Sequence, residues 1–382
     1  MIRLRSLTPL LLAVLCCLAC VIVLRDRTAR FVITIHSHPL DDEMQWIIRH
    51  QRQTIRELSA HPRVIFRCPE DGPVIEYPSH ASDDLTEMTM TTNDECENAS
   101  QMDAIIMVHT AANHFKRRQQ FRNIYSNYSN TKPYRLQVVF LIGSALNASL
   151  QLKLERENRD SGDTVVGAFL DTYHNLTLKA VMGFRWLTSA CPDVKLLIKM
   201  DDDVIFDARK FFTSYWTRMG NDRKKKALHC FVWNKAQVGR TGKWKVETDL
   251  FRESNYPFPY CAGFFVVVSP DLIKPLYVHG KNMRFFWIDD VFLYGMVPAS
   301  IGGVHFIQLQ RRKDTIVDNY SDLESCRERN GPGKCSVWAA LASKDEDFDL
   351  EYSAMLSPGM MFTKKKENVN ATFKVNVTIK EI

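Results

Sequence analysis

Three consecutive carboxylates are the residues of this sequence best suited to chemistry. Asp201, Asp202 and Asp203 follow the apolar segment 195–200 (KLLIKM), and since adjacent carboxylates repel, a fold keeps them only if they are solvated or compensated by a positive group. Mg²⁺ and Mn²⁺ prefer oxygen ligands and are typically held by one or two carboxylates plus substrate phosphates. On a strand Asp201 and Asp203 project to the same side, so the triplet predicts a divalent-cation site and leaves Asp202 for another contact. A solvated acidic turn, or a helix start capped by Asp207, is the alternative interpretation.

A second acidic pair, Asp289 and Asp290, follows the aromatic run 285–287 (FFW) and precedes the apolar segment 291–295 (VFLYG). Apolar surroundings raise the pKa of a carboxyl group, which suits it to act as a general base, and exposed aromatic faces are good platforms for sugar rings. The alternative is that an aspartate caps a helix over 291–297. The two interpretations are compatible.

Short apolar runs alternate with amphipathic segments through the middle of the chain, which predicts an α/β fold with a mostly parallel central sheet. The predicted strands are 104–108, 138–143, 195–200, 228–233 and 263–269, and the predicted helices are 115–125, 173–190, 207–219 and one that begins at Pro270. Ligands bind beyond the carboxyl ends of strands in open α/β sheets, so the acidic triplet stands where a ligand is expected.

Residues 7–24 form an almost purely apolar segment without charge, with arginines on both sides at positions 3, 5, 25, 27 and 30. A membrane-spanning helix needs about 20 apolar residues, whereas the apolar region of a signal peptide has about 7 to 15. The segment therefore predicts a transmembrane signal anchor, with a cleaved signal peptide as the alternative. The flanking charges are nearly balanced, so they do not orient the anchor by themselves.

Seven N-x-S/T sequons follow the predicted anchor, at Asn98, Asn127, Asn147, Asn175, Asn319, Asn370 and Asn376. Because such sequons are used only in the secretory lumen, they favour a luminal orientation. Seven of the ten cysteines also follow the anchor and form no CxxC pair, which favours disulfides over zinc or redox chemistry. A disulfide between Cys326 and Cys335, on either side of a Gly-Pro-Gly turn, is predicted, with buried free thiols as the alternative.

The composition is that of a folded protein, with 45% hydrophobic and 11% aromatic residues and a net charge of +6. The lysine runs 224–226 and 364–366 lack aromatic neighbours and binding motifs, so we interpret them as solvated loops and expect no nucleic-acid partner. The expected organisation is a cytoplasmic tail at 1–6, the transmembrane anchor at 7–24, a luminal stem at 25–100, a catalytic domain at 101–344 and an irregular C-terminal extension at 345–382.

Six motifs resemble, in the same order, those of the β-1,3-glycosyltransferases of the Galactosyltransferase family (glycosyltransferase family 31). They extend over about 200 residues, so chance is a poor explanation. The matching segments are 117–125 (RRQQFRNIY, resembling R-R-x-A-I-R-x-T-W), 140–143 (FLIG, F-L-L-G), 171–179 (DTYHNLTLK, D-x-Y-x-N-L-T-L-K), 199–204 (KMDDDV, K-x-D-D-D-V), 256–263 (YPFPYCAG, Y-P-x-Y-C-S-G) and 289–292 (DDVF, E-D-V-Y).

The resemblance implies a GT-A fold in a single Rossmann-like domain, a UDP-sugar donor, a Mn²⁺ requirement, and inversion at the anomeric carbon to give a β-1,3 linkage. Together with the anchor it predicts a single-pass type II Golgi membrane protein with a luminal catalytic domain. Its expected partners are the UDP-sugar and an acceptor glycan on protein or lipid.

Carried over residue by residue, the resemblance makes Asp203 the direct metal ligand and Asp201 a support of the metal shell. Asp290 is then the base that deprotonates the acceptor hydroxyl. His305 would complete the metal shell, as a histidine does in some relatives, and a core or surface histidine is the alternative.

The donor-binding residues implied by the resemblance are Asp202, Arg118, Arg122 and Lys199. Asp202 would reach the ribose or the sugar of the donor. Arg118 and Arg122 would contact the uridine diphosphate, whose phosphates suit the planar guanidinium group, and Lys199 belongs to the same set.

The sequence departs from the family pattern at Tyr125 for tryptophan, Ala262 for serine, Phe264-Phe265 for a glycine-rich continuation, and Asp289 for glutamate. The bulk of Phe264 should narrow the donor pocket, so the transferred sugar is predicted only as galactose or an N-acetylhexosamine. Two rival functions are a catalytically silent carbohydrate-binding or chaperone-like relative, which would lose the base, and a metal-dependent phosphohydrolase, which would release phosphate without an acceptor sugar.

Overall fold

The computed structural model describes residues 78–92, 101–145, 147–309, 315–331, 334–343 and 347–356. No helix within these ranges is both long and apolar enough to cross a membrane, and the anchor predicted at 7–24 lies outside them. The described residues form two compact units, where the sequence predicts one domain. The first comprises those up to Asp202 together with Met219–Gln308, and the second comprises Asp203–Arg218 and those from Leu309 onward.

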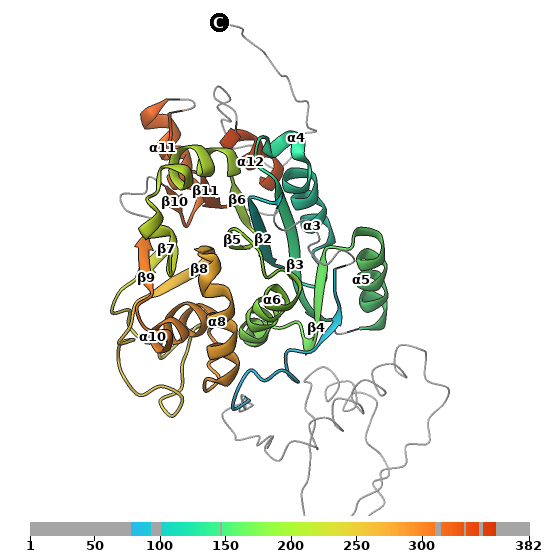
Figure 1. Ribbon diagram of the computed structural model, residues 1–382, viewed down its shortest axis with the longest axis vertical. Helices are drawn as coiled ribbons and strands as arrows, with labels where there is room; N and C mark the ends of the chain where they lie inside the picture. Colours follow the sequence, from blue (N-terminus) through green and yellow to red (C-terminus); the bar gives the residue numbers. More distant parts are fainter. Residues whose placement is uncertain are drawn as a thin grey trace, which may run out of the picture. The chain divides into compact units, whose positions relative to one another are not determined.

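An eight-stranded sheet forms the centre of the first unit (Figure 1). From one edge to the other its strands are β1 (Met88–Met90), β4 (Thr164–Leu170), β3 (Leu136–Ser144), β2 (Ala104–His109), β5 (Leu197–Asp201), β8 (Tyr260–Val268), β7 (Ala227–Trp233) and β9 (His305–Gln308). The pairings β4–β3, β3–β2, β2–β5 and β7–β9 are parallel, and β1–β4, β5–β8 and β8–β7 are antiparallel. The predicted α/β fold with a mostly parallel sheet is confirmed.

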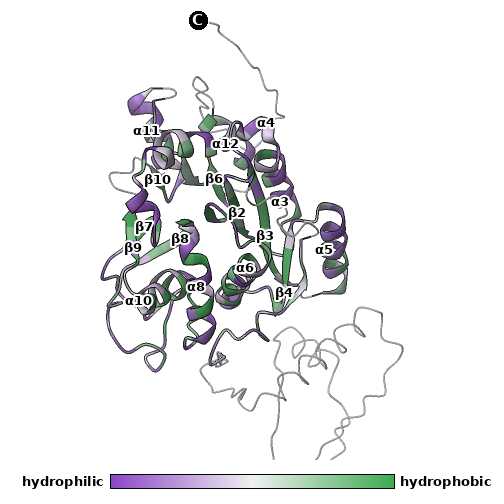
Figure 2. Ribbon diagram, in the orientation of Figure 1, coloured by the Kyte–Doolittle hydropathy of each residue, from purple (hydrophilic) through white to green (hydrophobic). Residues whose placement is uncertain are grey.

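Helices bury the central strands, which explains why those strands are continuous apolar runs and show no alternation. All six residues of β2 (AIIMVH) are buried. Figure 2 shows that strands β2 and β3 are mostly hydrophobic, whereas helix α5 is mostly hydrophilic. The helical segments of this unit are α3 (Phe115–Phe121) with a π-helical turn Arg122–Ser126, α4 (Tyr128–Thr131), α5 (Ala148–Ser161), the 3₁₀ turns Tyr173–Asn175 and Asn221–Lys224, α6 (Leu176–Ala190), α8 (Pro270–Asn282), α9 (Asp289–Val291), the π-helical turn Phe292–Met296, and α10 (Val297–Ile301).

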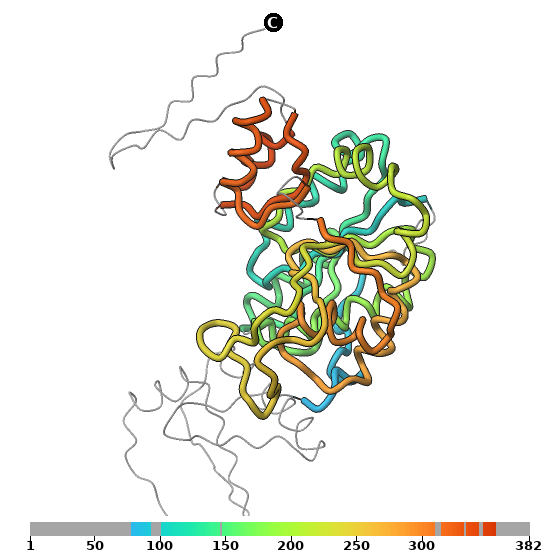
Figure 3. The backbone as a smooth tube through the Cα atoms, turned by 90° about the vertical axis from the view of Figure 1, so that its left-hand side faces the viewer, coloured from blue at the N-terminus to red at the C-terminus, as the bar shows by residue number. Residues whose placement is uncertain are grey.

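Local sequence signals set the ends of these helices. The side chain of Asn147 caps α5 by accepting from the amide of Leu150, and Gly162 ends it with a left-handed φ of 64°. Pro270 occupies the first turn of α8, where its missing amide proton costs nothing. The connection from β7 to β8, residues 234–259, carries only a β-bridge between Gln237 and Asn255 as regular structure (yellow in Figure 3).

The second unit contains a three-stranded sheet in the order β10 (Ile316–Val317), β11 (Ala339–Leu341), β6 (Val204–Phe206). Its helical segments are α7 (Ala208–Lys210) with the turns Phe211–Tyr215 and Trp216–Arg218, α11 (Tyr320–Asn330) and α12 (Phe348–Leu356). Phe211 packs edge-on against Phe206 and Trp338, with ring centroids 5.6 and 5.0 Å apart, and forms the aromatic core of this unit. The predicted disulfide Cys326–Cys335 is present.

Two segments outside the predicted catalytic domain contribute regular structure. Residues 88–90, within the predicted stem, form β1, because the chain there adds to the edge of β4 and Thr89 donates to the carbonyl of Val166. Helix α12 lies within the predicted irregular extension, and burial of Phe348, Ala354 and Met355 stabilises it although its sequence has weak helical periodicity.

Candidate functional site

Lys199 is the centre of the candidate site in the first unit. Its side chain is 1% exposed on β5, and its ammonium group donates to Asp201 Oδ1 at 2.7 Å and to the carbonyl of Gly263 at 2.5 Å. Burial lowers the pKa of Lys199, but the charges of Asp201 and the pair Asp289 and Asp290 outweigh burial and raise it overall. A buried, charged ammonium group therefore compensates the carboxylates around it.

Asp290 stands in the first turn of α9 and lies against strand β8 at Gly263. A Cβ atom at position 263 would lie 1.8 Å from Asp290 Oδ1, so only glycine admits the carboxylate in this place. Burial and the neighbouring charge of Asp289 raise the pKa of Asp290 to about 8, while Lys199 opposes the shift. A carboxyl group with a raised pKa can take up a proton near neutral pH, as a general base must.

Asp289, which the sequence analysis pairs with Asp290 and which stands where the family has glutamate, is part of the same cluster. It is 8% exposed, and burial raises its pKa, with Lys199 opposing and Asp201 adding to the shift. Its Oδ2 lies 3.9 Å from Nδ1 of His109, a 5% exposed residue at the end of β2. Burial and the charges of nearby lysines hold the pKa of His109 well below its usual value, so this imidazole is neutral.

The carboxylate of Asp202 is held by residues that follow β2. Thr110 Oγ1 donates to Asp202 Oδ2 at 2.5 Å, and Nδ1 of His114 lies 2.8 Å from the same oxygen. Burial raises the pKa of Asp202, but these contacts outweigh it and lower the pKa overall. Asp202 is therefore an ionised, oriented hydrogen-bond acceptor at the carboxyl ends of β2 and β5.

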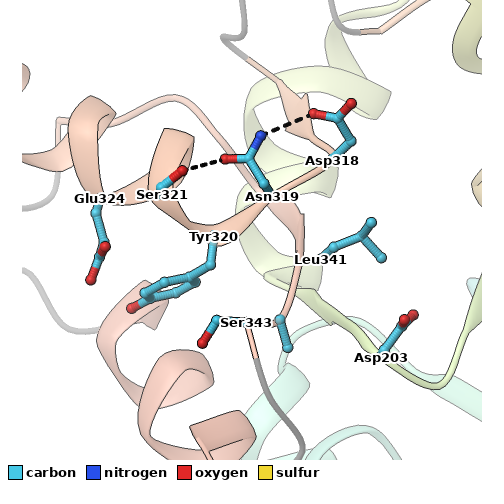
Figure 4. Close-up of a pocket in the computed structure, with 9 residues that line it drawn as sticks. Asp203, Asp318, Asn319, Tyr320, Ser321, Glu324, Leu341 and Ser343 are labelled. Carbon is cyan, nitrogen blue, oxygen red and sulfur yellow. Dashed lines mark hydrogen bonds between the residues drawn. The ribbon is translucent and has the colours of Figure 1, made fainter.

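Asp203 belongs to the second unit, where it lines a pocket of about 410 Å³ (Figure 4). Asp318 and Glu324 add two carboxylates to the lining, and Asn319 donates to Asp318 Oδ1 at 3.2 Å. Within the described ranges, no three His, Cys, Asp or Glu side chains form a group that could hold a metal. A cation shared with donor phosphates needs only one or two carboxylates, and an all-oxygen ligand set suits Mg²⁺ or Mn²⁺, so the residues present fit such an ion.

His305 lies away from Asp201 in the sheet of the first unit. Pairing across β5, β8, β7 and β9 places Leu197 level with Phe306, and β5 runs parallel to β9. Asp201 ends β5, whereas His305 begins β9, three strands away. With about 4.8 Å between neighbouring strands and about 3.3 Å per residue along a strand, the two residues lie about 20 Å apart. Strand pairing does not bring His305 to Asp201, and the contact of His305 with a metal stays a prediction. His305 is an exposed residue at a sheet edge.

Arg118 and Arg122 lie in an ion-pair network. The guanidinium of Arg118 is fully buried and donates to Glu157 and to the carbonyls of Ala111 and Ala112. Arg122 joins Glu157 at 2.8 Å and Asp163 at 2.7 Å. In this structure both arginines connect α3 to α5 and to the start of β4, so their contact with a donor stays a prediction.

Two contacts between family-motif residues and their neighbours hold the elements around the site in place. Lys179 on α6 donates to Asp171 Oδ1 at 2.6 Å and to the carbonyl of Thr110 at 2.7 Å, which links the motif 171–179 to the end of β2. The Cys230–Cys261 disulfide joins β7 to β8 two residues before Gly263. Neither the identity of this disulfide nor the contact of Lys199 with Gly263 was signalled by sequence spacing.

Comparison with known proteins identifies the family. Residues 116–310, which are 195 of the 382 residues, match the family model described as Galactosyltransferase. The chain belongs to the Galactosyltransferase family. The matched segment contains Lys199, Asp202, Gly263 and Asp290, the residues at the centre of the candidate site.

Relatives of this Galactosyltransferase-family chain include beta-1,3-galactosyltransferase 1 of Mus musculus and of Homo sapiens, each 28% identical over 213 residues, or 52% of this chain and 60% of the relative. Human UDP-GalNAc:beta-1,3-N-acetylgalactosaminyltransferase 1 is 30% identical over 195 residues, or 50% of this chain and 57% of the relative. The match therefore spans about three fifths of the length of these relatives.

Solved structures of glycosyltransferases match this chain with lower sequence identity than the relatives above. The glycosyltransferase involved in glycosylation of the major capsid of PBCV-1 is 10% identical with a TM-score of 0.36, covering 66% of this chain and 98% of that chain. Galactosyltransferase LgtC, in complex with donor and acceptor sugar analogues, is 9% identical with a TM-score of 0.33, covering 66% and 96%. The family assignment depends on the family match and not on these structures.

Proposed function

We propose that this chain is an inverting β-1,3-glycosyltransferase of GT-A type that moves galactose or an N-acetylhexosamine from a UDP-sugar to an acceptor glycan. Family membership supports glycosyl transfer. The observation that carries the proposal further is Asp290, a carboxyl group with a raised pKa that is seated against Gly263 and compensated by Lys199. A silent binding relative would not need such a group.

In the proposed reaction the acceptor oxygen attacks the anomeric carbon of the donor. Its proton passes to Asp290, and the bond between that carbon and the departing UDP breaks with inversion. Lys199 holds the carbonyl of Gly263 and thereby the strand on which Asp290 rests. Asp202, oriented by Thr110 and His114, would accept a hydrogen bond from a donor hydroxyl.

Asp203, with Asp201, would hold a divalent cation, and Mn²⁺ is the proposed ion. When bound, such a cation would neutralise the charge that develops on the departing diphosphate. The proposal also keeps the predicted anchor at 7–24, a stem after it, and a single-pass type II orientation in the Golgi membrane. Its catalytic residues would then face the lumen.

The test is to incubate the full-length chain with UDP-galactose, UDP-N-acetylglucosamine or UDP-N-acetylgalactosamine, with and without Mn²⁺, and with and without a panel of acceptor glycans. We expect UDP release that depends on both Mn²⁺ and an acceptor, with a new β-1,3 linkage in the product. Phosphate release without an acceptor would favour a phosphohydrolase, and glycan binding with no turnover would favour the silent relative.

A further inference from the structure

An exposed aromatic pair lies on the first unit outside the carboxylate cluster. Trp244 is 58% exposed and Tyr173 is 39% exposed, although side chains of this size usually bury most of their surface. The indole Nε1 of Trp244 donates to the hydroxyl of Tyr173 at 2.8 Å. Lys243 places its ammonium nitrogen 4.3 Å from the ring centroid of Tyr173 and 5.6 Å from that of Trp244. The two rings and the cation form one surface, which we call the aromatic platform.

The loop that carries Trp244 is held in shape by its own backbone. The amide of Val246 donates to the carbonyl of Gly239 at 2.8 Å, and Arg240 donates to the carbonyl of Val246 at 2.8 Å. A Cβ atom at position 239 would lie 2.7 Å from the carbonyl oxygen of Trp244, and Gly242 takes a left-handed φ of 73°. These contacts preorganise the exposed indole, so a ligand that stacks on it orders little of the chain.

The platform lies beside the proposed base. The ring of Tyr173 packs against that of Trp287 with centroids 6.1 Å apart, and Trp287 precedes Asp289 by two residues. Burial raises the pKa of Tyr173, the hydrogen bond from Trp244 opposes the rise, and the charges of Asp289 and Asp290 add to it, which is consistent with the position of Tyr173 near the carboxylate pair. A sugar ring on the platform would therefore be adjacent to Asp290.

We propose that Trp244, Tyr173 and Lys243 form the acceptor subsite, on which a neutral pyranose ring of the acceptor stacks by its apolar C–H face. Lys243 donates a hydrogen bond to a hydroxyl oxygen at the edge of that ring. This inference rests on the proposed function, because it assigns the acceptor side of the same reaction. A mere packing role for Trp244 is a poor alternative, since more than half of its surface faces solvent.

The experiment compares Trp244→Ala with Trp233→Ala in the full-length protein. Trp233 is a matched control, because it is also an exposed tryptophan of the first unit, 43% exposed, and it packs on Phe231 with centroids 4.8 Å apart. Methyl β-D-galactopyranoside and methyl N-acetyl-β-D-glucosaminide serve as acceptors. For Trp244→Ala we expect the acceptor KM to rise about tenfold or more with the donor KM within about twofold, the loss of a ring contact of roughly 1.4 kcal/mol.

Trp233→Ala should change neither constant by more than about twofold. Tyr173→Phe keeps the ring and removes the bond to the indole, so a smaller rise in the acceptor KM is expected. An unchanged acceptor KM in Trp244→Ala, or a change in the donor KM in its place, would overturn the proposal. Thermal unfolding of each variant shows whether it is folded.

Direct binding separates failure of this inference from failure of the proposed function. Saturation-transfer NMR of the two methyl glycosides with the wild type and with Trp244→Ala needs no turnover. If the wild type transfers no sugar, the proposed function fails, and the subsite is still decided by the NMR result. Saturation that is present in the wild type and lost in Trp244→Ala supports the platform, and equal saturation, or none in the wild type, refutes it.

Discussion

Replacing Gly263 by alanine should abolish most transfer while leaving the protein folded. The added Cβ would lie 1.8 Å from Asp290 Oδ1, whereas a carbon and an oxygen atom in ordinary contact are about 3.3 Å apart. The gap must therefore open by about 1.5 Å. Strand β8 cannot supply this movement, because it is paired with β5 and β7 on its two sides and bridged to β7 by a disulfide.

The carboxylate of Asp290 must move instead. A rotated side chain costs about 1 kcal/mol in stability, so the variant should fold. A displacement of about 1 Å of a catalytic group can cost about 100-fold in rate, and we expect kcat to fall by about that factor or more. The predicted signature is thus a large loss of activity with a small loss of stability.

The assay measures kcat for sugar transfer and the free energy of unfolding in urea, in parallel, for Gly263→Ala and Gly280→Ala. Gly280, on α8, is the matched control, because a Cβ atom there would meet nothing closer than Leu293 Cδ1 at an ordinary 3.6 Å. Alanine should be neutral there or stabilise the helix by up to about 1 kcal/mol. Wild-type kcat in Gly263→Ala would refute the reasoning, and so would a loss of kcat fully explained by unfolding.

Four further perturbations test the base and the strand against which it lies. The general base must be deprotonated, so kcat/KM of the wild type should rise with pH and level off above the pKa of Asp290, about 8. Asp289→Asn removes a negative charge that raises the pKa of Asp290, so the rise in kcat/KM should move to lower pH. Lys199→Met removes a positive charge that lowers this pKa, so the rise should move to higher pH. Measuring kcat/KM of each variant from about pH 6 to about pH 9 shows the direction of each shift. Replacing Cys230 and Cys261, 31 residues apart, by alanine opens a covalent loop and should lower the free energy of unfolding by about 4 kcal/mol in urea titrations, and a loss below about 1 kcal/mol would contradict the expected constraint.

Much of the fold could be predicted from local patterns. Continuous apolar runs marked β2, β3, β5, β7 and β8, because strands buried on both faces have this composition. Short pieces such as β1 and β9 were missed, since a strand of three or four residues at a sheet edge is stabilised by its partner strand more than by its own sequence.

Residues of the candidate site could be predicted only where several of them are adjacent in the sequence. The acidic pair 289–290 was recognised as a candidate base because it interrupts an aromatic and apolar segment, and the resemblance to the family motif singled out Asp290. The acidic triplet was recognised because three carboxylates in a row need compensation. The place of His305 could not be predicted because composition does not reveal register, and strand pairing puts this residue at the start of the edge strand β9 and Asp201 at the end of β5.

Long-range contacts lie beyond local patterns for the same reason. Lys199 meets Gly263, which is 64 residues away, only because β5 and β8 are neighbours. Trp244 likewise meets Tyr173 across 71 residues of chain. Spacing along the sequence carries no record of either contact.

The most direct test of the central claim is transfer by Asp290→Asn, which keeps the size of the side chain and removes its basicity. With a UDP-sugar, Mn²⁺ and a productive acceptor, kcat should fall by at least about 100-fold at every pH, as expected for loss of a general base, while donor affinity stays within about threefold of the wild type. Asp203→Ala, measured beside it, should also lose transfer, because the variant binds Mn²⁺ more weakly. Turnover by Asp290→Asn within about tenfold of the wild-type rate would contradict the assignment of Asp290 as the base and, with it, the proposed reaction.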